Sequence, residues 1–170
     1  SQADAMLYRE TENEDVRSFV YEMNDWLIHE HQIEQSSYED LIGAFTHNNP
    51  RTTATAVYLE GIHDAYLLAH DAKDTQRTEQ YKQSLENGLR YMLLAQYTPE
   101  NSFYVANPDR AIGGFRNSLT DSSQRIDGTQ HAVFAMLKAL ENGVLEDGKQ
   151  VVKAAAPVEE ENKSGCGCGR

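Results

Sequence analysis

The side chains that could perform chemistry gather between residues 103 and 131. This stretch holds three aspartates that could act as general acids or bases, Asp109, Asp121 and Asp127. Glycoside hydrolysis needs two carboxyl groups about 5 to 10 Å apart, and Asp127 could form such a pair with Asp109 or Asp121. We therefore take Asp127 and Asp109 as candidate catalytic residues. Asp127 could instead cap a helix by accepting main-chain N–H bonds, which keep a carboxylate ionised.

His131, among the polar residues at the end of the same stretch, is the third catalytic candidate. A histidine at such a position can equally be a hydrogen-bonded packing residue. His29 and His31 are two residues apart, so on a helix they point to different faces and lack the spacing of four with which two imidazoles bind zinc together. We predict no metal site and no cofactor.

Aromatic, basic and amide side chains in the same stretch could bind a polar ligand. The candidate ligand-binding residues are Phe103, Tyr104, Arg110, Phe115, Arg116, Asp121, Arg125 and Gln130. For Phe115 the alternative is that its ring fills the space between two helices. For Arg125 it is a bond to the carbonyl groups of its own loop.

Apolar residues recur at helical spacing in four segments. They predict helices from about Thr11–Asp15 to His29–Gln32, and over about 52–72, 75–97 and 127–142. One helical turn near Tyr38–Leu41 and a weaker helix over 144–156 are also expected. The loop over 98–124 is longer than most loops in compact domains and is rich in aromatic residues, which favours a functional loop.

A motif occurs twice in the chain. Ile42-Gly43-Ala44-Phe45, followed by Arg51 and Thr55, returns as Ile112-Gly113-Gly114-Phe115, followed by Arg125 and Thr129. Each copy lies between two predicted helices, so the repeating unit is a helical hairpin. Such hairpins bury their apolar faces by stacking on neighbours, and their loops line one surface. Six residues separate Phe45 from Arg51 and ten separate Phe115 from Arg125, which places an insertion in the second loop.

This pattern resembles the α/α-toroid folds, the six-hairpin glycosidases and the terpenoid cyclase and prenyltransferase group. The residues that carry the resemblance are Gly113-Gly114-Phe115 and the stretch from Arg125 to Phe134. It implies that the inner helices begin at a central funnel, with Arg125, Asp127, Gln130 and His131 near a ligand. The chain has too few helices for a closed ring, so the expected fold is all-α, with antiparallel helical hairpins that form an arc of a toroid.

Composition narrows the partners. The formal net charge of −12 disfavours nucleic acid and anionic membrane, because binding to phosphate backbones relies on Lys and Arg. No apolar run approaches the roughly 20 residues that span a bilayer. Both cysteines, Cys166 and Cys168, lie in the tail, so the cellular compartment stays open. The chain does not begin with Met, from which we expect a piece of a longer protein.

We therefore expect an N-terminal extension over 1–10, a helical hairpin repeat domain over 11–156, and a disordered acidic Gly/Cys tail over 157–170. The first hypothesis for function is a repeat-bearing part of a toroid protein that binds or processes a polar ligand, a saccharide by preference, at its loop-lined end. The alternative is a noncatalytic scaffold that associates with the rest of a longer protein, with further repeats, or with a second copy.

Overall fold

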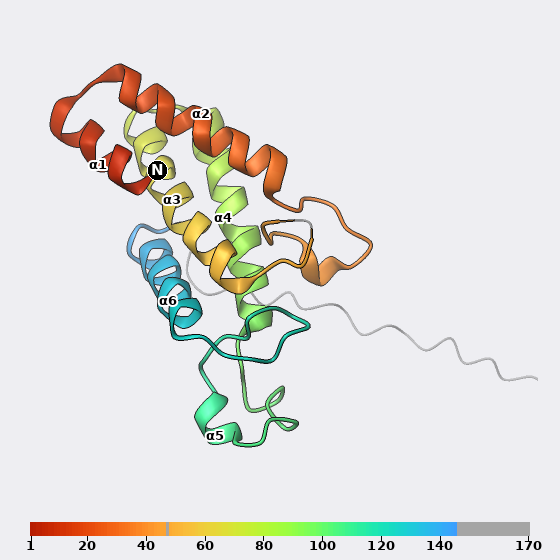
Figure 1. The fold of residues 1–170 in the computed structure, drawn as a ribbon. Coiled ribbons are helices and arrows are strands. Elements are labelled where there is room, and N and C mark those ends of the chain that lie inside the picture. Colours follow the sequence, from red (N-terminus) through yellow and green to blue (C-terminus); the bar gives the residue numbers. More distant parts are fainter. Residues whose placement is uncertain (47, 146–170) are drawn as a thin grey trace, which may run out of the picture.

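The computed structural model describes residues 1–46 and 48–145, and the regular secondary structure of this part is helical (Figure 1). The helices are α1 Gln2–Thr11, α2 Glu14–His31, α3 Thr52–Asp71, α4 Thr75–Ala95, α5 Pro108–Ala111 and α6 Ile126–Glu141, with a 3-10 turn, η1, at Glu39–Leu41. Within these residues extended pairing is limited to isolated bridges. The prediction of an all-α fold is confirmed.

The four long helices begin and end close to the predicted residues. The Asn13 side chain caps α2 by accepting a hydrogen bond from the Asp15 N–H. No helix of the described residues is long and apolar enough to cross a membrane. The predicted helix over 144–156 lies outside the described residues beyond residue 145, and so does the tail over 157–170.

The segment over 1–10, expected as an extension, is helix α1. It packs on α2 and α3, and its Ala5 is fully buried. The guanidinium of Arg17 lies 5.5 Å from the centre of the Tyr8 ring and donates to its hydroxyl, which holds α1 against α2. Residues 2–11 therefore belong to the helical domain.

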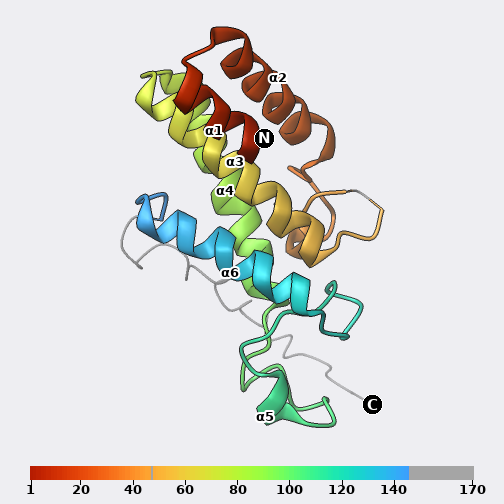
Figure 2. The same ribbon diagram turned by 60° about the vertical axis from the view of Figure 1, so that its left-hand side comes forward.

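Helix α3 is the centre of the molecule and contacts α1, α2, α4 and α6. It is joined to α4 by the short turn at 72–74, so these two helices are antiparallel neighbours. Helix α6 runs parallel to α3. His131 of α6 contacts Glu60 of α3, and one to two turns later Lys138 contacts Asp64, so both helices advance in the same direction (Figure 2).

Helices α2 and α4 also run in the same general direction. Asp25 of α2 meets Tyr81 of α4, and further along the Gln32 side chain donates to the Ser84 carbonyl. With α2 parallel to α4 and α3 parallel to α6, the segment from α2 to α3 and the segment from α4 to α6 lie at one end of the molecule. We call these segments the first connector, residues 32–51, and the second connector, residues 96–125.

The two connectors have the same main-chain hydrogen bonds at their base. In the first, Ile33 donates to Ala44 at 2.9 Å and accepts from Gly43 at 2.8 Å; in the second, Tyr97 donates to Gly114 and accepts from Gly113, both at 2.8 Å. Gly43 and Gly113 have φ values of 92° and 89°, a region that favours glycine.

The second connector also contacts the start of α3, directly after the first connector. The Thr52 N–H at the start of α3 donates to the Asn117 carbonyl of the second connector at 2.9 Å. The Tyr91 hydroxyl of α4 donates to the Pro50 carbonyl at 2.8 Å, and burial raises the pKa of Tyr91 to about 12. The connectors and the first turns of α3 and α6 therefore form one surface, which we call the rim.

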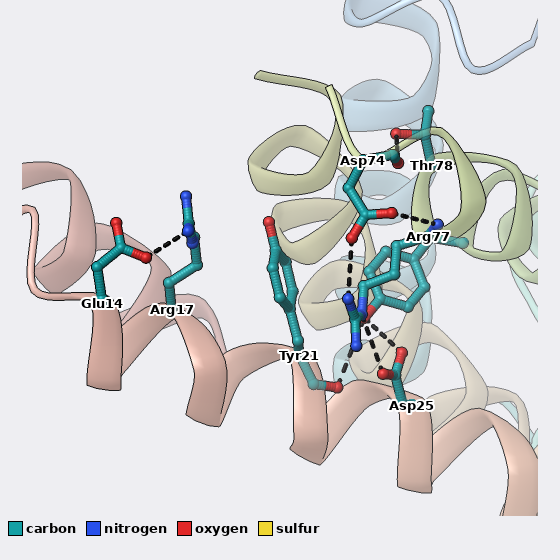
Figure 3. A network of polar contacts seen from close by, with 8 residues as sticks. Glu14, Arg17, Tyr21, Asp25, Asp74, Arg77 and Thr78 are labelled. Carbon is teal, nitrogen blue, oxygen red and sulfur yellow. Dashed lines mark hydrogen bonds and ion pairs between the residues drawn. The ribbon is translucent and has the colours of Figure 1, made fainter. Parts of the chain in front are cut away.

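At the opposite end, an ionic network joins α2 to α4 (Figure 3). The Arg77 guanidinium lies between the carboxylates of Asp25, at 3.1 Å, and Asp74, at 2.8 Å. It also lies 4.8 Å from the centre of the Tyr21 ring. The hydroxyl of the buried Tyr81 donates to Asp25 at 2.6 Å, and burial raises its pKa. This network fixes the relative position of α2 and α4 at the end away from the rim.

Candidate ligand site at the connector rim

The rim takes its polar character from the starts of α3 and α6. Arg51 and Arg125 are the residues before the first turns of these helices, in extended conformation, and their carbonyls accept the first helical N–H bonds, from Thr55 and Thr129. Both arginines are exposed. Because both helices begin at the rim, the positive ends of their dipoles face it.

Asp127, the first catalytic candidate, is paired within its own helix start. Arg125 donates to both of its carboxylate oxygens, at 3.0 and 2.7 Å, and the Gly128 N–H donates to one of them at 3.0 Å. The bond from Arg125 is the main reason that the pKa of Asp127 is lowered. Asp127 is therefore ionised at neutral pH, as expected of a residue that stabilises a helix start.

Asp121 belongs to a tight turn of the second connector. The Asn117 amide donates to it at 2.7 Å and the Ser123 N–H at 3.0 Å. These hydrogen bonds, with a small contribution from the positive charge of Arg51, lower the pKa of Asp121 to about 2. Asp121 is therefore ionised at neutral pH.

Asp109 and Arg110 lie on the short helix α5, at the outer end of the second connector (Figure 1). Both side chains are exposed and neither has a hydrogen bond or an ion pair with the described residues. Gln130, on the first turns of α6, is exposed in the same way. These three side chains are available to a ligand.

His131 faces α3. Its Nδ1 lies 2.7 Å from the Glu60 carboxylate, in a pair that is 30% and 15% exposed. Sequence reasoning missed Glu60, because it lies 71 residues away in the chain and has no motif around it. His131 and Glu60 border a cavity of about 500 Å³ between α2 and α3, whereas Asp109, Asp121 and Asp127 are absent from its lining.

Of the aromatic candidates, two are exposed and one is not. Phe103 and Tyr104 are 80% and 52% exposed, and their rings meet edge to face at 5.5 Å. Tyr104 also lies 6.4 Å from the ring of Tyr97, whose hydroxyl donates to the Ser122 carbonyl. Phe115 is 2% exposed and lies in the core. Its ring therefore fills the hairpin, and Phe103 and Tyr104 supply the accessible aromatic surface.

Arg116 is held by the end of α4. Its guanidinium donates to the carbonyls of Leu94 and Ala95 and lies 5.7 Å from the centre of the Tyr97 ring. Its donors satisfy carbonyl groups that the last turn of a helix leaves without partners. Arg116 thus stabilises the base of the second connector.

Two glutamines that sequence reasoning passed over complete the connector bases. Gln32 donates to the Gly43 carbonyl at 3.1 Å, and Gln96 donates to the Gly113 carbonyl at 3.2 Å. The signal was present in the repeat, because each glutamine immediately follows the first helix of its copy, α2 or α4. Among the described residues, no three His, Cys, Asp or Glu side chains lie together in a way that could hold a metal ion.

Comparisons with protein-family models, with curated proteins and with solved structures gave no match for this chain.

Proposed function

We propose that this chain is an arc of an α/α-toroid protein and that its rim binds a polar ligand, with a saccharide as the ligand class. The observation that carries the proposal is the meeting of both connectors, and of the starts of both inner helices, on one surface. The hydrogen bond from the Thr52 N–H to the Asn117 carbonyl marks this meeting point. In a toroid, this is the end at which the inner helices open toward the funnel.

The accessible groups of the rim suit a saccharide. Arginine, amide and carboxylate groups donate to and accept from hydroxyls, and exposed aromatic rings pack on the apolar faces of sugar rings. Arg51, Gln130 and Asp121 supply the polar groups, and Phe103 with Tyr104 supplies the rings.

The rim favours binding over hydrolysis. A glycosidase needs one carboxyl group that stays protonated near neutral pH. Hydrogen bonds lower the pKa values of Asp121 and Asp127, so both carboxyl groups are ionised. Asp109 is exposed on α5 and has no partner among the described residues that could act with it. We therefore propose a binding role for the rim, and a hydrolytic activity that Asp127→Asn with Asp109→Asn abolishes would contradict it.

The test is a binding screen of neutral and acidic oligosaccharides by saturation-transfer NMR, followed by calorimetry on any binder. Arg51→Ala and Tyr104→Ala should each weaken binding by at least about tenfold, a difference of about 1.4 kcal/mol. Arg9→Ala is the matched control, because Arg9 is an exposed arginine of α1, away from the rim. Equal affinities of all three variants, or no binding to any glycan, would contradict the proposal.

A noncatalytic interaction module is the second candidate, and one observation favours it. Helix α6 exposes an apolar stripe of Ile126, Val133, Phe134, Leu137 and Leu140, with Ile126 89% and Leu140 62% exposed. A further hairpin or a second copy could cover this stripe. Light scattering after gel filtration tests self-association: an oligomer that Leu137→Lys with Leu140→Lys converts to monomer supports it, and a monomeric parent chain contradicts it.

A further inference from the structure

The turn between α1 and α2 repeats the turn between α3 and α4. Glu12 and Lys73, each two residues before its second helix, have φ values of 51° and 58°. The next residues, Asn13 and Asp74, each accept an N–H bond with their side chains. Helix α1 therefore occupies the position before α2 that α3 occupies before α4, with equivalent residues 61 positions apart.

The first half of α3 covers the second half of α4. Leu59 lies against Gly88 so closely that a Cβ on Gly88 would come within 2.4 Å of its side chain. Pro50, just before α3, accepts the hydrogen bond from Tyr91, which is fully buried. The equivalent region beside α2 has no such cover among the described residues, because α3 has 20 residues and α1 has 10.

A cavity of about 500 Å³ lies at this uncovered place. The cavity walls include Met23, Trp26 and Leu27 of α2 with Val57 and Tyr58 of α3. Trp26 is 56% and Val57 41% exposed. The start of α1 closes one end, where the Ser1 hydroxyl donates to the Gly61 carbonyl at 2.9 Å. We call this cavity the groove.

The groove walls correspond to residues that are covered in the other hairpin. By the shift of 61, Leu27 corresponds to Gly88, which Leu59 of α3 covers. Val57 follows Arg51 by six residues, as His131 follows Arg125. His131 packs on α3 through Glu60. By the internal repeat, a helix placed in line with α1 would lie against the side chains at Leu27 and Val57.

We propose that the groove is the docking site of an amphipathic helix of about ten residues, packed end to end with α1. At 1.5 Å per residue such a helix is about 15 Å long. Its buried face should carry small residues and one leucine, like the first half of α3, where Thr52, Thr55, Ala56 and Leu59 are all fully buried. The interface continues the one that α1 already makes with α2 and α3. The groove is separate from the rim and does not depend on what the rim binds.

The experiment places a copy of residues 52–61 directly before Ser1 of the full chain. The register is kept because Ser1 corresponds to Ile62 by the shift of 61 between equivalent residues. Trp26 is the only tryptophan of the chain and reports on the groove. We expect a blue shift of its emission, weaker quenching by acrylamide, and a melting temperature higher by at least about 2 °C.

The matched control is the same extension with glutamate at the copies of Ala56 and Leu59. Both extensions remove the charge of the Ser1 ammonium, which pairs with Asp4, so this loss cancels in the comparison. The control should leave Trp26 emission unchanged, and Val57→Lys in the chain with the native copy should abolish the shift. Identical behaviour of the two extensions would overturn the proposal. A shift produced by a free oligosaccharide but not by the native copy would assign the groove to a small ligand and would also overturn it.

Discussion

The glycines at the bases of the two connectors give a matched test of the fold. Gly43 and Gly113 have nearly equal φ values, 92° and 89°. Their surroundings differ. A Cβ on Gly43 would lie 2.0 Å from the carbonyl oxygen of Asn87, whereas a Cβ on Gly113 would meet no atom of the described residues within 4 Å. Gly113→Ala therefore measures backbone strain alone, and Gly43→Ala adds a collision with the main chain of α4.

The expected magnitudes follow from these two terms. Positive φ costs an alanine about 1 to 2 kcal/mol, partly offset by about 0.5 kcal/mol from the reduced entropy of the unfolded chain, so Gly113→Ala should cost about 1 kcal/mol. The collision at Gly43 involves main-chain atoms that cannot rotate away, so that variant should lose more than about 4 kcal/mol. With a urea dependence of about 2 kcal/mol per molar, the midpoints should fall by about 0.5 M and about 2 M.

The assay is urea unfolding followed by far-UV circular dichroism. Gly143→Ala is a second control, since Gly143 has a φ of 65° and a Cβ there would meet no atom of the described residues within 4 Å. It should behave like Gly113→Ala. Failure of only the Gly43 variant to fold would agree with the reasoning. Free energies of unfolding for the Gly43 and Gly113 variants that agree within about 1 kcal/mol would show that the first connector does not lie against α4 as described.

Three further predictions concern the contacts that hold the hairpins together. Gln32→Ala should lower the free energy of unfolding by about 1 to 3 kcal/mol, because the buried amide of Gln32 donates to two main-chain carbonyls. Gln96→Ala, at the less buried equivalent position, should lower it by less than about 1 kcal/mol. Equal losses of the two variants in urea unfolding would contradict this prediction. Tyr81→Phe should cost about 1 kcal/mol by removing the 2.6 Å hydrogen bond to Asp25, and an unchanged urea midpoint would contradict the bond. Hydrogen bonds from Arg77 lower the pKa of Asp74 below its ordinary 3.8, so the stability that they confer is present above pH 3.8 and is lost as the pH falls through the folded-state pKa. Asp74→Asn should therefore lose less stability than the parent chain between about pH 4 and pH 2 in thermal melts, and parallel acid limbs would refute the assignment.

The long helices could be predicted from sequence because their apolar periodicity reflects the packing that they make. Helix α1 could not, because Ala5 is its only fully buried apolar residue while Met6 and Leu7 are exposed. Its position depends on the turn at Glu12 and Asn13, which can be recognised as a helix–helix turn only by comparison with the equivalent turn at Lys73 and Asp74. Repetition of a turn was a stronger signal than the hydrophobic pattern of the helix before it.

The candidate site was predictable where its contacts are local. The pairing of Asp127 with Arg125 spans two residues, and its capping alternative was readable from the position at a helix start. The contact of His131 with Glu60 spans 71 residues, and no spacing rule reaches that far. The burial of Phe115 could be predicted only in part. The glycines before it predict a tight turn, but they do not determine the direction of the ring.

The second connector is longer than the first, so a comparison of the two shows which contacts both copies of the repeat share and which differ. Both connectors preserve the glycine, the buried phenylalanine and the glutamine amide bond at their base, although only the second carries α5 and the turn around Asp121. Hydrogen bonds that are present in both connectors, despite their different lengths, connect two helices. The residues that form them are therefore poor candidates for ligand contacts. The parts that differ between the copies are free of that constraint. Phe103, Tyr104, Asp109 and Asp121 all lie in the second connector, and we propose that they set the specificity of the rim for its ligand.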